Sequence, residues 1–91
     1  MVDYEWDENK RLSNLADHKL DCRDAWRVYE ADDKVTYKSR YPHEDRWIDL
    51  AEVEDIILIL VYTLRVGAVR CISFRPAKRG RERELYHEQR R

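Results

Sequence analysis

Four kinds of side chain in this sequence could act together on a phosphodiester: a guanidinium, a carboxylate, an imidazole and a phenol. Cleavage of a phosphodiester by a neighbouring hydroxyl without a metal ion needs a base for the hydroxyl proton, a cation for the charge on the phosphate and an acid for the departing oxygen. The residue types do not decide which group is the base and which is the acid. The candidates for catalysis are His18, Glu44, Arg46, Arg75 and Tyr86.

Arg75 is the first choice for the cation, because a guanidinium can hold a phosphate through two parallel hydrogen bonds. Pro76 follows it and lacks the N–H that a continuing strand would need, so Arg75 is expected at a strand end. Glu44 and Arg46 are two residues apart and would project from the same side of an extended chain. They could serve as base and phosphate ligand, or form an ordinary surface ion pair.

His18 and Tyr86 are expected on helices. An imidazole titrates near ~6.5, so His18 could carry a proton at neutral pH, or it could make a local hydrogen bond at a helix end. Tyr86 could stack on a base or donate a proton, and the alternative is that its ring anchors the helix. Lys10 could contact a phosphate, or it could simply lie on a solvated helix face. The remaining residues predicted to contact a phosphate-bearing substrate are Lys10, Arg70, Lys78, Arg79 and Arg83.

The sequence has no pattern for a metal ion or another cofactor. His18 and Cys22 are four residues apart but straddle an expected helix break, while His43 and His87 have no paired ligand spacing. The only glycines, Gly67 and Gly80, cannot form a glycine-rich phosphate loop. No metal site and no cofactor are therefore expected.

Charge is distributed unevenly along the 91 residues, whose formal net charge is −1. Residues 1–64 hold 9 Lys or Arg against 16 Asp or Glu, whereas residues 65–91 hold 9 against 3. A basic end on an acidic body suggests a local anionic partner. A well-solvated helix would explain the same charges.

The candidate residues must be positioned by a sheet centred on residues 56–76. Residues 56–63 are a continuous apolar, β-branched run, which predicts a strand covered on both faces. Gly67 permits a turn within residues 64–68, and residues 69–75 form the return strand. The apolar run is far shorter than the roughly 18 residues that a membrane span requires.

Other strands are expected over residues 2–6, 34–39 and 46–50, with a turn at residues 51–55. Helices are expected over residues 8–17, with Asp7 as N-cap, and from Asp21 onward. The first would turn Leu12, Leu15 and Ala16 to the core and Lys10, Arg11, Ser13 and Asn14 to solvent. The second would bury Cys22, Ala25, Trp26 and Tyr29.

The last helix, over residues 77–91, has only Leu85 and Tyr86 as an apolar stripe, so its end is expected to fray or to need a partner. The order β-α-α-β-β-β-β-α predicts one α+β domain with a small antiparallel sheet. The first ten residues lack the apolar segment of an export signal, so a reduced, cytoplasmic setting is expected. Cys22 and Cys71 are then buried apolar residues rather than a redox pair.

Seven short segments occur in a fixed order and spacing, although none is specific alone. They are Trp6-Asp7-Glu8-Asn9-Lys10, Asn14-x-x-x-His18, Ala25-x-x-Val28-Tyr29, Glu44-x-Arg46, Val61-Tyr62-Thr63, Arg70-x-Ile72-Ser73-x-Arg75-x-Ala77 and Glu82-Arg83-x-x-Tyr86. Together they resemble the BrnT family of type II toxins over nearly the whole chain. The resemblance implies a RelE-like fold and an endoribonuclease that arrests translation and growth in the bacterial cytoplasm.

The resemblance also implies a partner. A BrnA-type antitoxin, a ribbon-helix-helix protein, would neutralise the toxin in a heterotetramer, and operator DNA would be contacted only through that antitoxin. RNA would be the substrate, and no membrane is involved.

The chain departs from the family pattern in three places. Asp17-His18-Lys19 stands where Lys-His-Gly is common, which changes the charge beside a candidate catalytic residue. Ala51 replaces a common glycine and Phe74 a common small residue. One alternative is therefore a module that binds a partner without catalysis. Another is RNA binding without cleavage through the aromatic residues Trp47, Phe74 and Tyr86.

Overall fold

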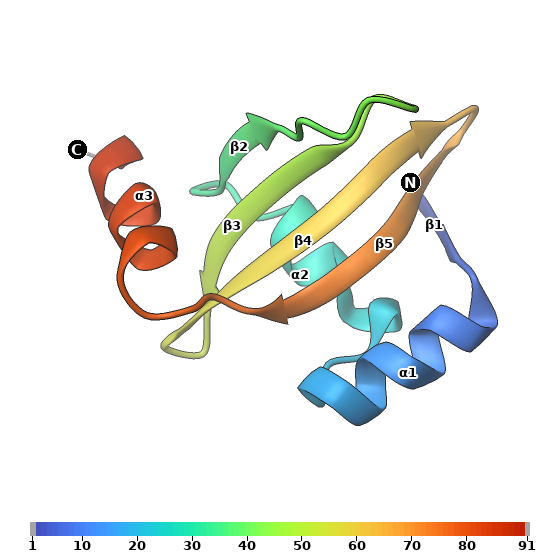
Figure 1. Ribbon diagram of the computed structural model, residues 1–91, viewed down its shortest axis with the longest axis horizontal. Coiled ribbons are helices and arrows are strands. Elements are labelled where there is room, and N and C mark those ends of the chain that lie inside the picture. Colours follow the sequence, from blue (N-terminus) through green and yellow to red (C-terminus); the bar gives the residue numbers. More distant parts are fainter. Residues whose placement is uncertain (1, 91) are drawn as a thin grey trace.

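The computed structural model describes residues 2–90 as a twisted five-stranded sheet with helices on both sides (Figure 1). Across the sheet, the strand order is β1-β5-β4-β3-β2, and every neighbouring pair is antiparallel except β1 and β5. The strands are β1 (Asp3–Trp6), β2 (Val35–Lys38), β3 (Trp47–Val53), β4 (Ile56–Arg65) and β5 (Ala68–Pro76). The α+β class and the element order are confirmed.

The sheet is mixed rather than antiparallel, because β1 pairs in parallel with β5. The hairpin connections β2–β3, β3–β4 and β4–β5 force their strands to be antiparallel. Residues 7–67 separate β1 from β5, so no short turn fixes their direction. The prediction of a purely antiparallel sheet is therefore wrong at this one edge.

The β4–β5 hairpin is central, as predicted. Residues 57–60 of β4 are all buried, which requires cover on both faces of the sheet. Gly67 has φ 74° in the turn before β5, and β5 ends at Pro76. The predicted turn over residues 51–55 is wrong, because β3 continues to Val53 and only Glu54 and Asp55 turn. Ala51 is completely buried within β3, next to the buried Leu50.

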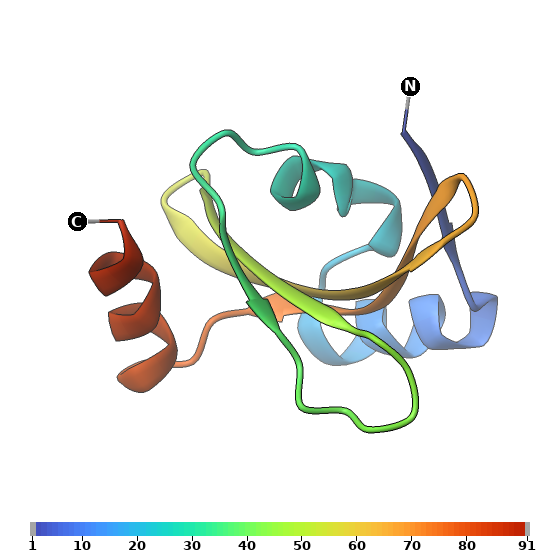
Figure 2. The ribbon, with the colours of Figure 1, turned by 90° about the horizontal axis from the view of Figure 1, so that it is seen from above.

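The two faces of the sheet carry separate clusters of buried side chains. On one face, Phe74, Leu58 and Leu60 pack with residues of η1 (Cys22–Asp24) and α2 (Trp26–Tyr29). Figure 2 shows α2 on one side of the sheet. The other face carries Leu50, Ile59 and the buried ring of Tyr86 from α3 (Arg81–Gln89). We call this second side the open face, because α3 covers only one end of it (Figure 1).

Helix α1 (Glu8–His18) lies along β5 and turns a polar residue inward. Asp7 accepts a hydrogen bond from the Lys10 N–H, which confirms the N-cap. Asn14 is the buried residue of this helix, while Leu12 and Leu15 are 51% and 37% exposed. The prediction that Leu12, Leu15 and Ala16 face the core, with Asn14 in solvent, is therefore wrong.

Asn14 explains this orientation. Its side-chain oxygen accepts from the Phe74 N–H at 3.1 Å, and its amide donates to the Phe74 carbonyl at 2.6 Å. The amide also donates to the Leu20 carbonyl at 3.0 Å. Beyond β1, the edge of β5 would otherwise present unpaired backbone groups. Asn14 therefore pairs the sheet edge as a strand would.

The second helical segment begins as predicted and buries a different residue. Asp21 caps it by accepting from the Arg23 N–H. Cys22, Ala25 and Val28 are buried, whereas Trp26 is 47% exposed. The prediction that Trp26 faces the core is wrong, because the segment is a 3₁₀ turn followed by a single α-helical turn. Burial of both Cys22 and Cys71 is confirmed.

Helix α3 begins at Arg81, four residues later than predicted, after Gly80 with φ 84°. Tyr86 is its buried residue, and the Tyr37 hydroxyl donates to the Leu85 carbonyl at 3.3 Å. Arg90 reaches the Asp33 carboxylate at 3.2 Å. The last residue of the predicted helix, Arg91, lies outside the described residues. No helix in residues 2–90 is long and apolar enough to cross a membrane.

Candidate functional site

The best-defined cation on the open face is Arg75, near the end of β5. It pairs across the ladder with Ile59, and its guanidinium contacts Glu82 in the first turn of α3. One nitrogen donates to Glu82 Oε1 at 2.9 Å and the other to Oε2 at 2.7 Å. The two side chains are 24% and 27% exposed. Arg75 therefore holds a planar oxyanion in the two-point geometry that also suits phosphate.

Glu82 is held as a carboxylate by two partners. The hydrogen bonds from Arg75 and then the 2.6 Å bond from the Lys78 N–H lower the pKa of Glu82 to about 2. The same ion pair raises the pKa of the Arg75 guanidinium. Glu82 is therefore fully charged at neutral pH and is a poor proton acceptor.

The Glu82 ion pair should make stability depend on pH in a definite window. Since its pKa falls from the ordinary 4.5 to about 2 in the folded chain, its contribution is complete above about pH 4.5 and is lost as pH falls towards 2. Urea unfolding across this window should show a shallower pH dependence for Glu82→Gln than for the native chain. Asp21, whose pKa is also about 2, accounts for part of the remaining slope.

Glu84→Gln is the matched control for this measurement, since Glu84 is an exposed carboxylate on the same helix. It should keep the native pH dependence. Equal slopes for Glu82→Gln and Glu84→Gln would contradict the role given to the ion pair.

An apolar groove of about 190 Å³ lies beside Arg75 on the open face. Its floor is formed by side chains of β3 and β4, and Leu85 of α3 forms part of its wall. It offers little hydrogen bonding besides the Arg75–Glu82 pair and the Tyr37 hydroxyl, so a flat or apolar group would fit it better than a polar one. The lining residues are Tyr37, Ile48, Leu50, Ile59, Val61, Arg75, Glu82 and Leu85.

Glu44 and Arg46 meet at the other end of the open face. Their side chains form an ion pair at 2.9 Å, and Arg65 lies 3.6 Å from the second oxygen of Glu44. The Arg46 guanidinium stacks 3.7 Å from the centre of the Tyr41 ring. The Arg46 carbonyl accepts from the Ser39 N–H, so the β2–β3 ladder extends to it. Strand alternation then places its side chain on the same face as Ile48.

The two arginine ends are separate sites rather than one cluster. Arg75 pairs with Ile59, and Ile59 pairs with Leu50, so the three residues form one row across the sheet. Arg46 is four residues before Leu50 and belongs to another row. At ~3.3 Å per residue, the two rows are about 13 Å apart. An extended polyanion crossing the open face could therefore meet both, whereas a single phosphate could not.

His18 and Tyr86 stand apart from these ion pairs. His18 is exposed in the last turn of α1, one turn beyond Asn14, and α1 and β5 run side by side (Figure 1). Because Asn14 is fixed to Phe74, His18 lies near the same end of β5 as Arg75. Tyr86 is 1% exposed, with its hydroxyl 2.9 Å from Arg90 and 3.4 Å from Asp33. Its ring anchors α3, and a catalytic role stays a prediction.

Lys19, which follows His18, has the left-handed backbone conformation that glycine usually adopts after a helix. It caps α1 in the left-handed region, at φ 59° and ψ 26°, and its N–H bonds to the Leu15 carbonyl. Glycine is preferred at this position because it has no Cβ to strain. The Lys19 departure therefore alters the side chain beside His18 while leaving the turn intact.

The other predicted RNA contacts differ in availability. Arg70 is half-buried and forms an ion pair with Glu5 at 3.2 Å. The exposed members of the set are Lys10, Lys78, Arg79 and Arg83. Three of these flank the start of α3, close to the Arg75–Glu82 pair, whereas Lys10 is in the first turn of α1.

A family model described as the ribonuclease toxin BrnT of type II toxin–antitoxin systems matches residues 6–81. The match covers most of the chain, including Arg75 and the strands that form the open face. The chain belongs to the BrnT family. Family membership makes it a ribonuclease toxin of a type II system, with RNA as substrate and an antitoxin as partner. A search of curated proteins found no match.

The BrnT match ends at Arg81, the first residue of α3, and therefore does not extend to Glu82 or Tyr86. Sequence reasoning did not assign Glu82 a role, although it is the carboxylate that occupies Arg75. The available signal is weak: Glu82 is one of two acidic residues in the first turn of α3. Tyr41 and Arg65, which complete the Arg46 end, were also missed because a loop and a hairpin bring them together.

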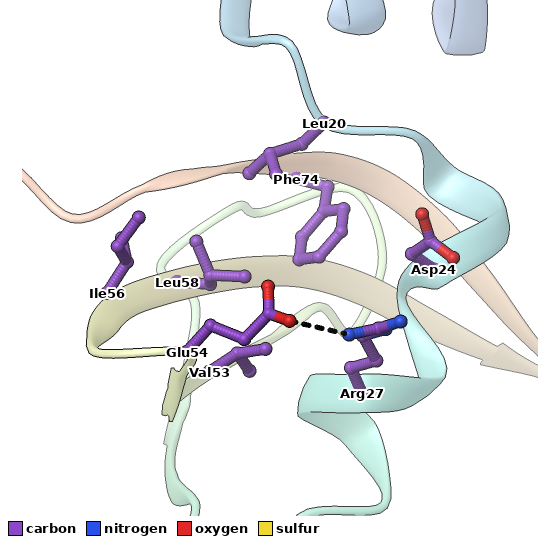
Figure 3. Close-up of a pocket in the computed structure, with 8 residues that line it drawn as sticks. All are labelled: Leu20, Asp24, Arg27, Val53, Glu54, Ile56, Leu58 and Phe74. Carbon is purple, nitrogen blue, oxygen red and sulfur yellow. Dashed lines mark ion pairs between the residues drawn. The ribbon is translucent and has the colours of Figure 1, made fainter.

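A second cavity, of about 270 Å³, lies on the opposite face of the sheet (Figure 3). Leu58, Phe74 and Leu20 form an apolar part of its wall. Arg27 and Glu54 form an ion pair at 3.9 Å beside it, and Asp24 adds a second carboxylate. Two carboxylates against one arginine make this cavity a poor place for RNA phosphate.

None of the residues described, 2–90, form a group of three His, Cys, Asp or Glu side chains arranged to bind a metal ion.

Proposed function

We propose that this BrnT chain binds single-stranded RNA across the open face and cleaves it by attack of a 2′-OH on a phosphate held by Arg75, without a metal ion. The observation that carries the proposal is the two-point grip of Arg75 on an oxyanion at the edge of an apolar groove. A phosphate at this place would receive the charge stabilisation that the transition state of cleavage needs.

The remaining groups have roles that follow from their places. Arg46, about 13 Å along the strand direction, holds a second phosphate of the same RNA. The apolar groove between the two ends accepts a base against Tyr37 and the aliphatic floor. Proton transfer at the phosphate on Arg75 falls to His18, which lies near the same end of β5, since Glu82 is held charged and Tyr86 is buried. Glu44 is paired with Arg46, about 13 Å away along the strand direction, and does not reach this phosphate.

The proposed partner is a BrnA-type ribbon-helix-helix antitoxin that covers α3 and the neighbouring end of the open face. Apart from the buried Tyr86, helix α3 has few apolar side chains and many exposed charges, so further contacts with a partner would stabilise it. The complex is a heterotetramer that reaches operator DNA only through the antitoxin. The proposed setting is the bacterial cytoplasm.

Expression of the chain without its antitoxin should arrest growth and degrade cellular RNA, and co-expression should restore both. The measurement is growth rate together with the integrity of total RNA on a gel. Arrest arises because the open face is then free to bind RNA. Normal growth with intact RNA, from protein shown to be folded, would contradict the proposal.

A specific observation supports one alternative, a binding module without catalysis. Arg46 and Arg75 are each paired with a carboxylate, so the site's main cations are already neutralised. In that case the protein would bind the antitoxin and leave RNA intact. The RNA gel separates the two functions directly.

A further inference from the structure

The two-point grip of Arg75 is already fully used within the chain. Each of its two terminal nitrogens donates to a different oxygen of Glu82, at 2.9 and 2.7 Å, and one also donates to the Pro76 carbonyl at 3.2 Å. A phosphate bound at the terminal edge of the guanidinium would need the two nitrogens that Glu82 occupies. A phosphate at the remaining edge, formed by Nε and Nη2, would lie beside the negative Glu82 carboxylate and be repelled by it. Glu82 and an RNA phosphate therefore compete for Arg75.

Glu82 is a persistent competitor because it has a second support. The Lys78 N–H donates to its Oε1 at 2.6 Å, a hydrogen bond that does not involve Arg75. The Tyr86 ring and the Arg90–Asp33 ion pair hold the rest of α3 to the body. The Glu82 side chain can therefore release Arg75 by rotating, without detachment of the helix.

The surroundings favour an incoming anion over the carboxylate once an RNA is present. Lys78, Arg79 and Arg83 are exposed near Glu82, and a polyanion would gain contacts with them that Glu82 cannot make. The exposed fractions of Arg75 and Glu82, 24% and 27%, leave the pair open to solvent and to a ligand.

We propose that Glu82 is an intramolecular competitor of RNA phosphate at Arg75, so that RNA must displace it before the phosphate is held for cleavage. This inference rests on the proposed function, since it assumes that Arg75 is the phosphate ligand. Glu82 then sets how tightly the toxin binds RNA. It is a positioning residue, because it acts through Arg75 and takes no proton.

The test is binding of a fluorescent 2′-O-methyl RNA, which cannot be cleaved because the attacking hydroxyl is blocked. Glu82→Gln keeps the size of the side chain and should bind about three- to tenfold more tightly than the native chain. Glu84→Gln makes the same charge change at an exposed position and should improve binding less than about twofold. In the double variant Arg75→Ala/Glu82→Gln, the gain should vanish.

Equal affinities for Glu82→Gln and Glu84→Gln would overturn the inference. So would a gain that persists in the double variant, since Arg75 would then not be the group released. Cleavage of unmodified RNA, measured beside binding, distinguishes the two proposals. Cleavage by the native chain without a gain in Glu82→Gln would leave the proposed function standing. If Glu82→Gln binds RNA more tightly but no variant cleaves it, the proposed cleavage of RNA is overturned and the competition between Glu82 and RNA at Arg75 is supported.

Discussion

Replacing Arg75 by alanine should lower the rate of RNA cleavage at least about 100-fold, the effect expected when a preorganised donor to a developing oxyanion is lost. Arg75 contributes both the positive charge and the two parallel donors that phosphate accepts. The measurement is the initial rate of cleavage of a long RNA by purified protein. Arg75→Lys keeps the charge and loses the planar grip, so its rate should fall between those of the native chain and Arg75→Ala.

Two further variants separate chemistry from stability in this experiment. Arg27→Ala removes an arginine on the opposite face, where its ion pair with Glu54 is a long 3.9 Å, and should leave cleavage unchanged. Arg75→Ala also leaves the Glu82 carboxylate unpaired, which Arg75→Ala/Glu82→Gln corrects. Activity that returns in this double variant would show that Arg75 is needed for folding only, and would refute its role in cleavage.

Replacing Asn14 by alanine should lower the free energy of unfolding by about 2–4 kcal/mol, because it leaves the buried N–H and C=O of Phe74 without a partner. For a chain of this length, that loss corresponds to a fall in Tm of roughly 10–20 °C. Thermal unfolding followed by circular dichroism measures it.

Asn9→Ala is the matched control, since Asn9 is an exposed asparagine of the same helix. Its effect should be within about 0.5 kcal/mol, as for ordinary surface substitutions. If the two variants unfold at the same temperature, Asn14 does not hold the edge of β5.

Much of the fold could be predicted because its signals are local. The apolar run of residues 56–63 required a strand covered on both faces, and residues 57–60 are buried. Gly67, with its left-handed backbone, precedes the start of β5, and Pro76, which lacks an N–H, ends the strand. Asp7 and Asp21 cap helical segments as their side chains predict.

The errors lie where tertiary contacts outweigh local pattern. Helical periodicity assigned Leu12 and Leu15 to the core, yet hydrogen bonds between Asn14 and the β5 edge turned the helix the other way. The parallel pairing of β1 with β5 joins segments that residues 7–67 separate, so no turn residue signals it. Ala51 looked like part of a turn because its neighbours are acidic, although its own position is fully buried.

The candidate site could be predicted only one residue at a time. A strand-end arginine before a proline pointed to Arg75, and a spacing of two joined Glu44 to Arg46. The occupation of Arg75 by Glu82 depends on how α3 returns to the sheet after Gly80, which no local pattern encodes. For the same reason, the sequence did not reveal that the two arginine ends are separate. The interpretation that the Tyr86 ring anchors its helix was available from the sequence, and the burial of Tyr86 agrees with it.

The most direct test of metal-independent RNA cleavage through Arg75 is to incubate a long RNA with the purified, antitoxin-free chain in buffer containing EDTA. The Arg75→Ala variant is run beside it. Cleavage by the native chain, with products ending in 2′,3′-cyclic or 3′-phosphate, together with intact RNA in the Arg75→Ala lane, is the predicted result. Intact RNA in both lanes from folded protein, or equal cleavage in both, would contradict the claim that the open face cleaves RNA through Arg75.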